Sequence, residues 1–171
     1  ALVELYGDAC RRAQQAGYDG VELHAAHSYM LLGSFLSPLR NHRTDAYAGR
    51  KLEGRMKLLV DVITNIRSKV GPDFPIILRM SGYEREAGGR EINDTQRMAP
   101  LLVQAGASAN TISGGVGDNN ITQIIPGSET RNGLNVSAAA AIRQVVDVPV
   151  MVVGRNTDVQ TAETILQDES A

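Results

Sequence analysis

Two histidines and a tyrosine stand close together in the segment VELHAAHSYM, residues 21–30. His24 and His27 are three residues apart, and Tyr29 follows two residues after the second histidine. Imidazole groups bind metal ions or hydrogen-bond to substrates, and the phenol of a tyrosine can transfer a proton. The segment therefore indicates a metal site, a substrate-binding site, or two satisfied polar groups at the end of a strand.

A metal ion would need three or four ligands in suitable geometry. His42 lies in a charged loop, and the sequence shows no Asp or Glu cluster at the end of an apolar run. The other interpretation is a pair of N–H donors aimed at an oxygen that gains negative charge, with Tyr29 nearby as a proton donor. We favour this substrate clamp and expect no metal, with a metal-dependent barrel hydrolase as the alternative.

Arg79 stands inside the apolar run IILRMS, residues 76–81. A buried guanidinium needs a partner, because an unpaired charge is costly to take out of water. One interpretation is a salt bridge to an acidic residue of the next strand. The interpretation that we favour is binding of an anionic or electron-rich ligand by the planar fork of the arginine.

Gly154 and Arg155 follow the apolar run VPVMVV and precede a capped helix start. A glycine turn frees backbone N–H groups, and a neighbouring cation suits them to a phosphate. The alternative is that Gly154 only permits the turn. The segment SGG, residues 113–115, would similarly let a ligand approach the backbone, although this signal is weak.

Helical and strand patterns alternate along the whole chain. We expect helices at about 2–16, 52–70, 93–105, 137–145 and from 157 or 158 to the end, and strands at about 18–25, 75–81, 108–113 and 148–154. Gly17, Gly71 and Gly106 would stop three of the helices. Asn93 or Asp94, and Ser137, would cap two of them.

Apolar strands separated by amphipathic helices predict an α/β fold with a parallel sheet, in one domain over residues 1–171. The connections after the strands are longer and richer in glycine and polar residues than those before them. In α/β folds this places the site at the carboxyl ends of the strands. No G-x-G-x-x-G segment joins a strand to a helix, so half of an eight-stranded barrel is favoured over a doubly wound sheet.

Composition narrows the class of protein. The chain has 171 residues with a net charge of −2, 43% apolar and 21% charged residues, which indicates a soluble globular domain without a basic field for nucleic acid. No apolar run reaches the length of a membrane span. Cys10 is the only cysteine, which excludes an internal disulfide and favours a cytoplasmic location.

The segment GYDGVELHAAHSYMLLGSFLSPLRNHRTDAYAGRKLEGR resembles the strand-four segment of the old yellow enzyme family. That family includes NADH:flavin oxidoreductases, 2,4-dienoyl-CoA and 2-enoate reductases and trimethylamine dehydrogenase. It typically reads GFDGVEIHGAHGYLL, then FLSP, then N-x-RTD-x-YGG. The resemblance continues through LRMSG, ISGG and VPVMVVGR, and it implies a partial (β/α)8 TIM barrel with strands four to seven and their helices.

The resemblance also implies roles for the clustered side chains. His24 and His27 would hold the carbonyl oxygen of a small-molecule substrate, and Tyr29 would deliver a proton to the carbon alpha to it. The implied reaction is reduction of an activated C=C bond, in an enone, an enoate or an enoyl-CoA. Two fixed N–H groups would stabilise the enolate-like oxygen most where its charge is greatest.

For cofactors, the resemblance implies FMN, with NAD(P)H as reductant. Arg79 would face the N1/O2 edge of the flavin, and Gly154 and Arg155 would contribute to its phosphate site. The family's remaining strands, and the cysteines that bind an iron–sulfur cluster in one branch, would lie outside these residues. Two copies could cover each other's open sheet edges as a homo-oligomer. The alternative is a folded fragment of such a barrel without catalytic activity.

Overall fold

A computed structural model describes residues 1–117 and 120–171 of the chain. Four strands form one sheet, and seven helical segments lie within the described residues. The strands are β1 (Val21–Ala25), β2 (Ile76–Ser81), β3 (Ala109–Ser113) and β4 (Val150–Val152). The helices are α1 (Leu2–Gln15), α2 (Leu31–Leu36), α3 (Leu52–Val70), α4 (Ile92–Ala105), α5 (Ile121–Ile124), α6 (Val136–Arg143) and α7 (Val159–Gln167).

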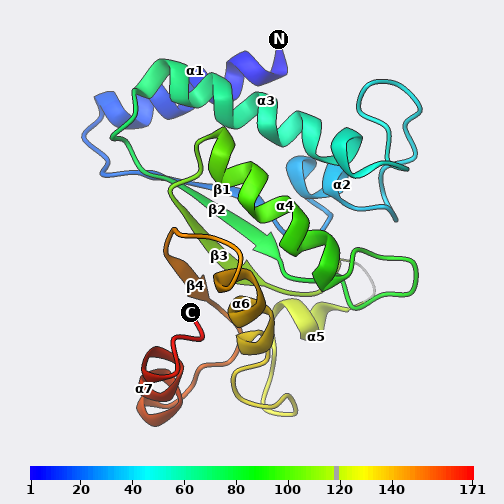
Figure 1. The fold of residues 1–171 in the computed structure, drawn as a ribbon, viewed down its shortest axis with the longest axis vertical. Coiled ribbons are helices and arrows are strands. Elements are labelled where there is room, and N and C mark those ends of the chain that lie inside the picture. Colours follow the sequence, from blue (N-terminus) through cyan, green and yellow to red (C-terminus); the bar gives the residue numbers. More distant parts are fainter. Residues whose placement is uncertain (118–119) are drawn as a thin grey trace.

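The sheet is parallel throughout, and its spatial order β1-β2-β3-β4 is the order of the chain. Each strand returns to the next through a helix, as the alternating sequence pattern predicts. Figure 1 shows this progression from β1 to β4, with α3, α4 and α6 in the connections. In the described residues β1 and β4 are the edges of the sheet.

The two faces of the sheet differ in polarity, because successive side chains of a strand point to opposite faces. On the face that carries the helices, Leu23, Leu78, Ile112 and Val150 are buried in the hydrophobic core. The opposite face carries one row of residues that are register partners: His24, Arg79, Thr111 and Met151. This alternation therefore keeps His24, Arg79 and Thr111 on the face opposite the apolar core.

Helix α3 provides the largest part of the core. Its apolar stripe includes Leu59, Ile63 and Ile66, which are at most 1% exposed. Burying each such side chain contributes about 1.5–3 kcal/mol. Gly71 ends the helix with a φ of +81°, a left-handed conformation that costs glycine little, and Gly106 ends α4 in the same way. These stops confirm the sequence prediction.

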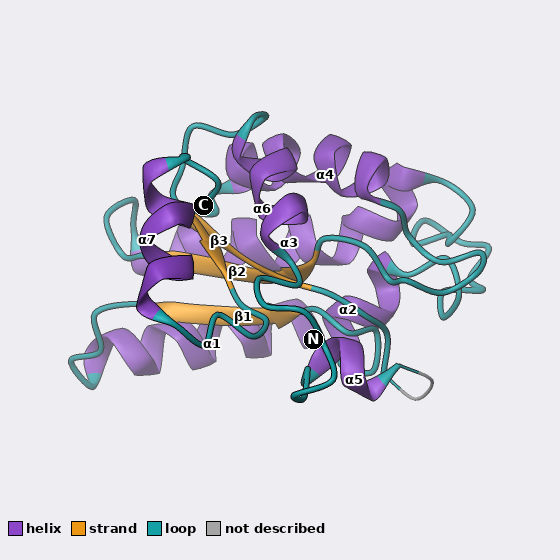
Figure 2. Ribbon diagram, turned by 90° about the horizontal axis from the view of Figure 1, so that it is seen from below, coloured by secondary structure: helices purple, strands orange, loops and turns teal. Residues whose placement is uncertain are grey.

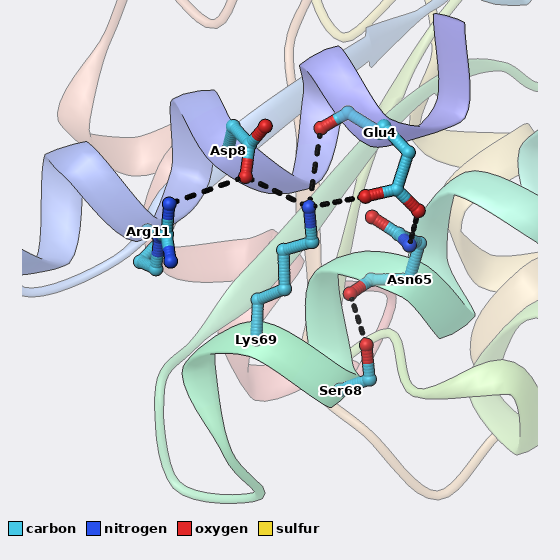
Figure 3. A network of polar contacts seen from close by, with 6 residues as sticks. All are labelled: Glu4, Asp8, Arg11, Asn65, Ser68 and Lys69. Carbon is cyan, nitrogen blue, oxygen red and sulfur yellow. Dashed lines mark hydrogen bonds and ion pairs between the residues drawn. The ribbon is translucent and has the colours of Figure 1, made fainter. Parts of the chain in front are cut away.

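Helix α1 packs along α3 (Figure 1), and a polar network at their surface fixes how the two align. Lys69 of α3 lies between two carboxylates of α1, with its Nζ 2.6 Å from Glu4 Oε2 and 2.8 Å from Asp8 Oδ1. Asn65 donates a hydrogen bond to Glu4, and Arg11 approaches Asp8 (Figure 3). Exposed ion pairs stabilise little, so the network chiefly sets the register of the helices.

Two predicted helix caps are wrong. Helix α4 begins at Ile92 after Glu91, and neither Asn93 nor Asp94 caps it, because the Asp94 carboxylate instead binds Arg55 Nη2 at 2.6 Å. Helix α6 follows Asn135 rather than Ser137. The side chain of Asn135 does not cap the helix, because its amide donates to Val153 O, just after β4, over 2.7 Å. A tertiary partner outcompetes the predicted cap at α4, whereas α6 begins one residue before Ser137.

The remaining boundaries differ slightly from the sequence prediction. Strand β1 begins at Val21 rather than Tyr18, and α7 ends at Gln167 before the end of the chain. Asp158 caps α7 as predicted, with its Oδ1 accepting from Thr161 N over 2.7 Å. The short helices α2 and α5 were not predicted. Figure 2 shows them among the loops at the end toward which the strands point.

Candidate active site

The site begins at the row formed by His24 of β1 and Arg79 of β2, which are partners in the parallel ladder. Glu22 lies on the same face, two residues before His24, and its Oε1 is 3.9 Å from Arg79 Nη1. Its other oxygen accepts a hydrogen bond from Thr111 Oγ1 over 2.8 Å. Arg79 thus meets an acidic residue of the preceding strand, and its Nε is buried without a partner among the described residues.

His24 is half-buried and neutral. Its Nδ1 accepts a hydrogen bond from the backbone N–H of Ala26 over 3.3 Å, so the ring proton is on Nε2. Burial lowers the pKa of His24, and the positive charge of Arg79 lowers it further. Its Nε2–H donates to no group in residues 1–117 and 120–171. His24 therefore presents a neutral N–H donor on the polar face of the sheet.

His27 is buried, at 1% exposure, and both its ring nitrogens contact the end of β3. Nδ1 lies 3.1 Å from Gly114 O, and Nε2 lies 3.4 Å from Ser113 Oγ. A carbonyl oxygen only accepts, so Nδ1 carries the proton and Nε2 accepts from the serine hydroxyl. Burial is the main reason that the pKa of His27 is lowered to about 4, and the charges of His24, once it is protonated, and of Arg79 lower it further.

Tyr29 completes a cluster of three rings with the two histidines. Its ring stacks on His27 at an interplanar angle of 10° with centroids 5.9 Å apart, and it meets His24 edge-on at 5.9 Å. The two imidazoles are themselves 5.5 Å apart. Tyr29 is 54% exposed, whereas His27 is buried behind it. The three side chains that the sequence analysis grouped together are therefore in contact in the structure.

Gly154 and Arg155 lie beyond the end of β4, three strands away from β1. The guanidinium of Arg155 donates to backbone carbonyls of the 127–130 segment, at 3.3 Å to Gly127 O and 2.9 Å to Thr130 O. Both residues have positive φ, +134° and +54°. A side chain at Gly154 would collide with Asn135, so this turn requires glycine. The structure therefore groups the histidines, Tyr29 and Arg79, but not the predicted phosphate pair.

A profile of the NADH:flavin oxidoreductase / NADH oxidase family matches residues 1–171. The chain belongs to this family. It is 36% identical over 170 residues to an NADH oxidase of Thermoanaerobacter brockii, which covers 99% of this chain and 26% of that protein. It is 34% identical to a cinnamate reductase of Clostridium sporogenes, over 91% of this chain and 25% of the relative.

The family's solved structures have the same fold. The structure of a 2-naphthoyl-CoA reductase in complex with 2-naphthoyl-CoA superposes with a TM-score of 0.88 at 26% identity, over 99% of this chain and 25% of that one. Such neighbours are TIM barrels, and the chain spans about a quarter of the relatives named here. Its four parallel βα units are a partial (β/α)8 barrel, as the sequence predicts.

Membership of the family implies FMN as the flavin and NAD(P)H as the electron donor. The residues present fit a flavin at one position in particular: Arg79 is a cation on the polar face with a buried Nε that has no partner among the described residues. At the predicted phosphate position, Arg155 would have to exchange its backbone carbonyls for the phosphate. Arg79 could therefore contact FMN as it stands, whereas Arg155 could bind the phosphate only after giving up its present partners.

The sequence did not reveal the residues that hold the loop of His27 and Tyr29 in place. Glu84, fully buried in the connection after β2, accepts hydrogen bonds from Ser28 and Ser37. Ser81 accepts from the backbone N–H of His27 over 3.0 Å. The only sequence signal was an acidic residue three positions after a strand, which does not distinguish a buried hub from a solvated loop.

In residues 1–117 and 120–171 no three His, Cys, Asp or Glu side chains gather so that they could hold a metal ion. None of the helices described is long and apolar enough to cross a membrane.

Proposed function

We propose that this chain carries the substrate-binding part of an FMN-dependent oxidoreductase that uses NAD(P)H to reduce an activated C=C bond. The ring cluster of His24, His27 and Tyr29 beside Arg79 is the observation that supports this most directly. The cluster would provide a neutral N–H donor, a phenol and a cation near the end of the sheet where α/β barrels bind ligands.

His24 is the group best prepared to bind the substrate's carbonyl oxygen. Its Nε2–H has no partner in the described residues, and its lowered pKa keeps the ring neutral near pH 7. A donor fixed in advance stabilises the oxygen more as negative charge develops, which accelerates the reaction rather than only binding the substrate. His27 would add a second donor from Nε2 only after exchanging its Nδ1–H contact with Gly114 for the other tautomer.

Tyr29 is the proton donor in this proposal. Its ring packs against both imidazoles, and just over half of its surface is exposed. A phenol held beside the substrate can protonate the carbon next to the carbonyl group as the C=C bond is reduced. FMN, when bound, supplies the hydride that it has received from NAD(P)H. Arg79 would then stabilise the negative charge on the reduced flavin.

The names of two family members support a substrate class. One is a cinnamate reductase and another binds 2-naphthoyl-CoA. Both names describe acyl groups conjugated with an unsaturated system. We therefore propose an unsaturated acid or its thioester as the substrate of the protein to which these residues belong.

Binding of FMN to the purified chain tests the proposal. We expect quenching of flavin fluorescence on titration, with an affinity that falls about tenfold or more in Arg79→Gln, because a charged hydrogen bond contributes about 1.5–3 kcal/mol. The matched control Arg97→Gln removes an exposed arginine of α4 and should bind like the original chain. Absence of any quenching by FMN would contradict the proposal.

Turnover is measured separately, as anaerobic NADH or NADPH oxidation in the presence of FMN and cinnamate. Activity that falls in His24→Ala and Tyr29→Phe would support the assigned roles. Flavin binding without any oxidation would favour the alternative of a folded barrel fragment without catalysis.

A further inference from the structure

His27 and Ser28 are consecutive residues in the left-handed region, with φ of +63° and +58°. A side chain makes this conformation unfavourable for residues other than glycine, and two such residues in succession require strong restraints. The family pattern given above has glycine where this chain has Ser28. The loop that carries the ring cluster is therefore strained in this chain, and its restraints decide where the rings point.

Three hydrogen bonds hold the strained pair. The hydroxyl of Ser28 donates to Glu84 Oε1 over 2.6 Å. The backbone N–H of His27 donates to Ser81 Oγ over 3.0 Å, and the carbonyl of His27 accepts from Gly117 N over 2.7 Å. Only the first of these bonds uses a side chain that the family's glycine lacks.

Glu84 connects this loop to two other segments. Its second oxygen, Oε2, accepts from Ser37 Oγ at the end of α2 over 2.9 Å and from the backbone N–H of Arg90 over 3.0 Å. The carboxylate is fully buried, and the backbone N–H of Glu84 bonds to Arg90 O over 2.8 Å. One acceptor-only group thus receives three donors from three separate segments, which leaves it little freedom to move.

We propose that Glu84 is a positioning residue, which fixes the orientation of His27 and Tyr29 through its hydrogen bond to Ser28. Ser28 stands between the two ring residues in sequence, so its backbone angles set how the ring of Tyr29 lies relative to that of His27. Glycine at this position would adopt the left-handed conformation without strain. In this chain the hydrogen bond from Ser28 to Glu84 holds the strained conformation instead. The orientation of the two rings is inferred from these contacts alone. Only the role of the rings in substrate binding rests on the proposed function.

Substitutions at Ser28 separate the restraint from the strain. Ser28→Ala removes the hydroxyl and keeps a Cβ in the left-handed region, whereas Ser28→Gly removes both the hydroxyl and the strain. Glu84→Gln keeps the shape of the carboxylate and replaces one acceptor by an NH₂ donor, which conflicts with the donors around it. Ser68→Ala is the matched control, because its hydroxyl bonds to Asn65 O on the exposed face of α3.

The experiment is ¹⁵N NMR of the histidine rings in the full chain, titrated between pH 4 and 8. In the unchanged chain we expect His27 as the Nδ1–H tautomer down to about pH 4. In Ser28→Ala and Glu84→Gln the tautomers should mix and the pKa of His27 should rise by at least one unit. Ser28→Gly should show a smaller shift, and Ser68→Ala none.

Circular dichroism melts of the same variants separate a positioning role from a general loss of structure. If Glu84→Gln does not fold, the two Ser28 variants decide whether the bond between Ser28 and Glu84 positions the rings. A His27 tautomer and pKa that stay unchanged in folded Ser28→Ala would overturn the proposal. So would shifts that appear equally in Ser68→Ala. The readout needs no flavin, so failure of FMN to bind would contradict the proposed function and leave this result intact.

Discussion

Arg79 lies directly opposite His24 in the parallel ladder between β1 and β2, so a guanidinium and an imidazole share one face of the sheet. Burial is the main reason that the pKa of His24 is lowered, and the charge of Arg79 beside it lowers the pKa further. A neutral imidazole can donate to a carbonyl oxygen, while the arginine offers its charge to an electron-rich ligand. The register of two strands therefore contributes to the chemical state of a candidate site residue.

Removal of the Arg79 charge should raise the pKa of His24. In Arg79→Gln the charge that lowers it is lost, although burial still holds the pKa below its ordinary value. Proton NMR of the imidazole C2–H signals against pH measures the change, with Arg97→Gln as the control. An unchanged His24 titration in Arg79→Gln would show that the two side chains do not interact.

The stability of the fold should rise with pH across the acidic range, in part through His27. The folded chain protonates His27 near pH 4, and the unfolded chain does so near the ordinary value of 6.5. Between these values the unfolded state binds more protons, so the contribution is complete above pH 6.5 and is lost toward pH 4. The contribution of His27 to the free energy of unfolding amounts to about 3 kcal/mol.

Urea unfolding at several pH values, for the unchanged chain and for His27→Gln, isolates that contribution. The free energy of unfolding of the variant should depend less steeply on pH between 4 and 6.5. Equal slopes for the two proteins would contradict a buried, neutral His27.

Arg155 should distinguish FMN from riboflavin, which lacks the phosphate. Arg155→Ala is expected to weaken FMN binding about tenfold and to leave riboflavin binding unchanged, if the guanidinium exchanges its carbonyl partners for the phosphate. Arg143→Ala is the matched control, because Arg143 also donates to a backbone carbonyl, that of Val146. An equal loss of affinity for both flavins would assign Arg155 to the 127–130 segment alone.

Arg55 should be important for stability. Its side chain is 8% exposed, and it joins Asp94 of α4 to the carbonyl of Gly49. Arg55→Met leaves the carboxylate of Asp94 without its partner, so we expect a loss of about 3 kcal/mol in urea unfolding. Asp94→Asn keeps a hydrogen-bonding group and should lose less. A change below about 0.5 kcal/mol in Arg55→Met would mean that the ion pair adds nothing net.

The sequence predicted the long elements well, because periodicity and glycine stops are local signals. Helix α3 spans the predicted residues, and Gly17, Gly71 and Gly106 have positive φ where helices were expected to end. The caps of α4 and α6 were mispredicted, because Asp94 bonds to the distant Arg55 and α6 begins one residue before Ser137. Helices α2 and α5, of six and four residues, are too short to show a period.

The sequence by itself determined the parallel βα architecture and the family, and it supplied the candidate site residues. The register between β1 and β2, which places His24 and Arg79 on one face, came from the tertiary structure. The tertiary structure decided which groups are available: His27 is occupied by β3, Arg155 by the 127–130 segment, and the nitrogen Nε2 of His24 by no described residue. A hydrogen bond between distant segments depends on three-dimensional proximity, which neither residue type nor spacing along the chain specifies.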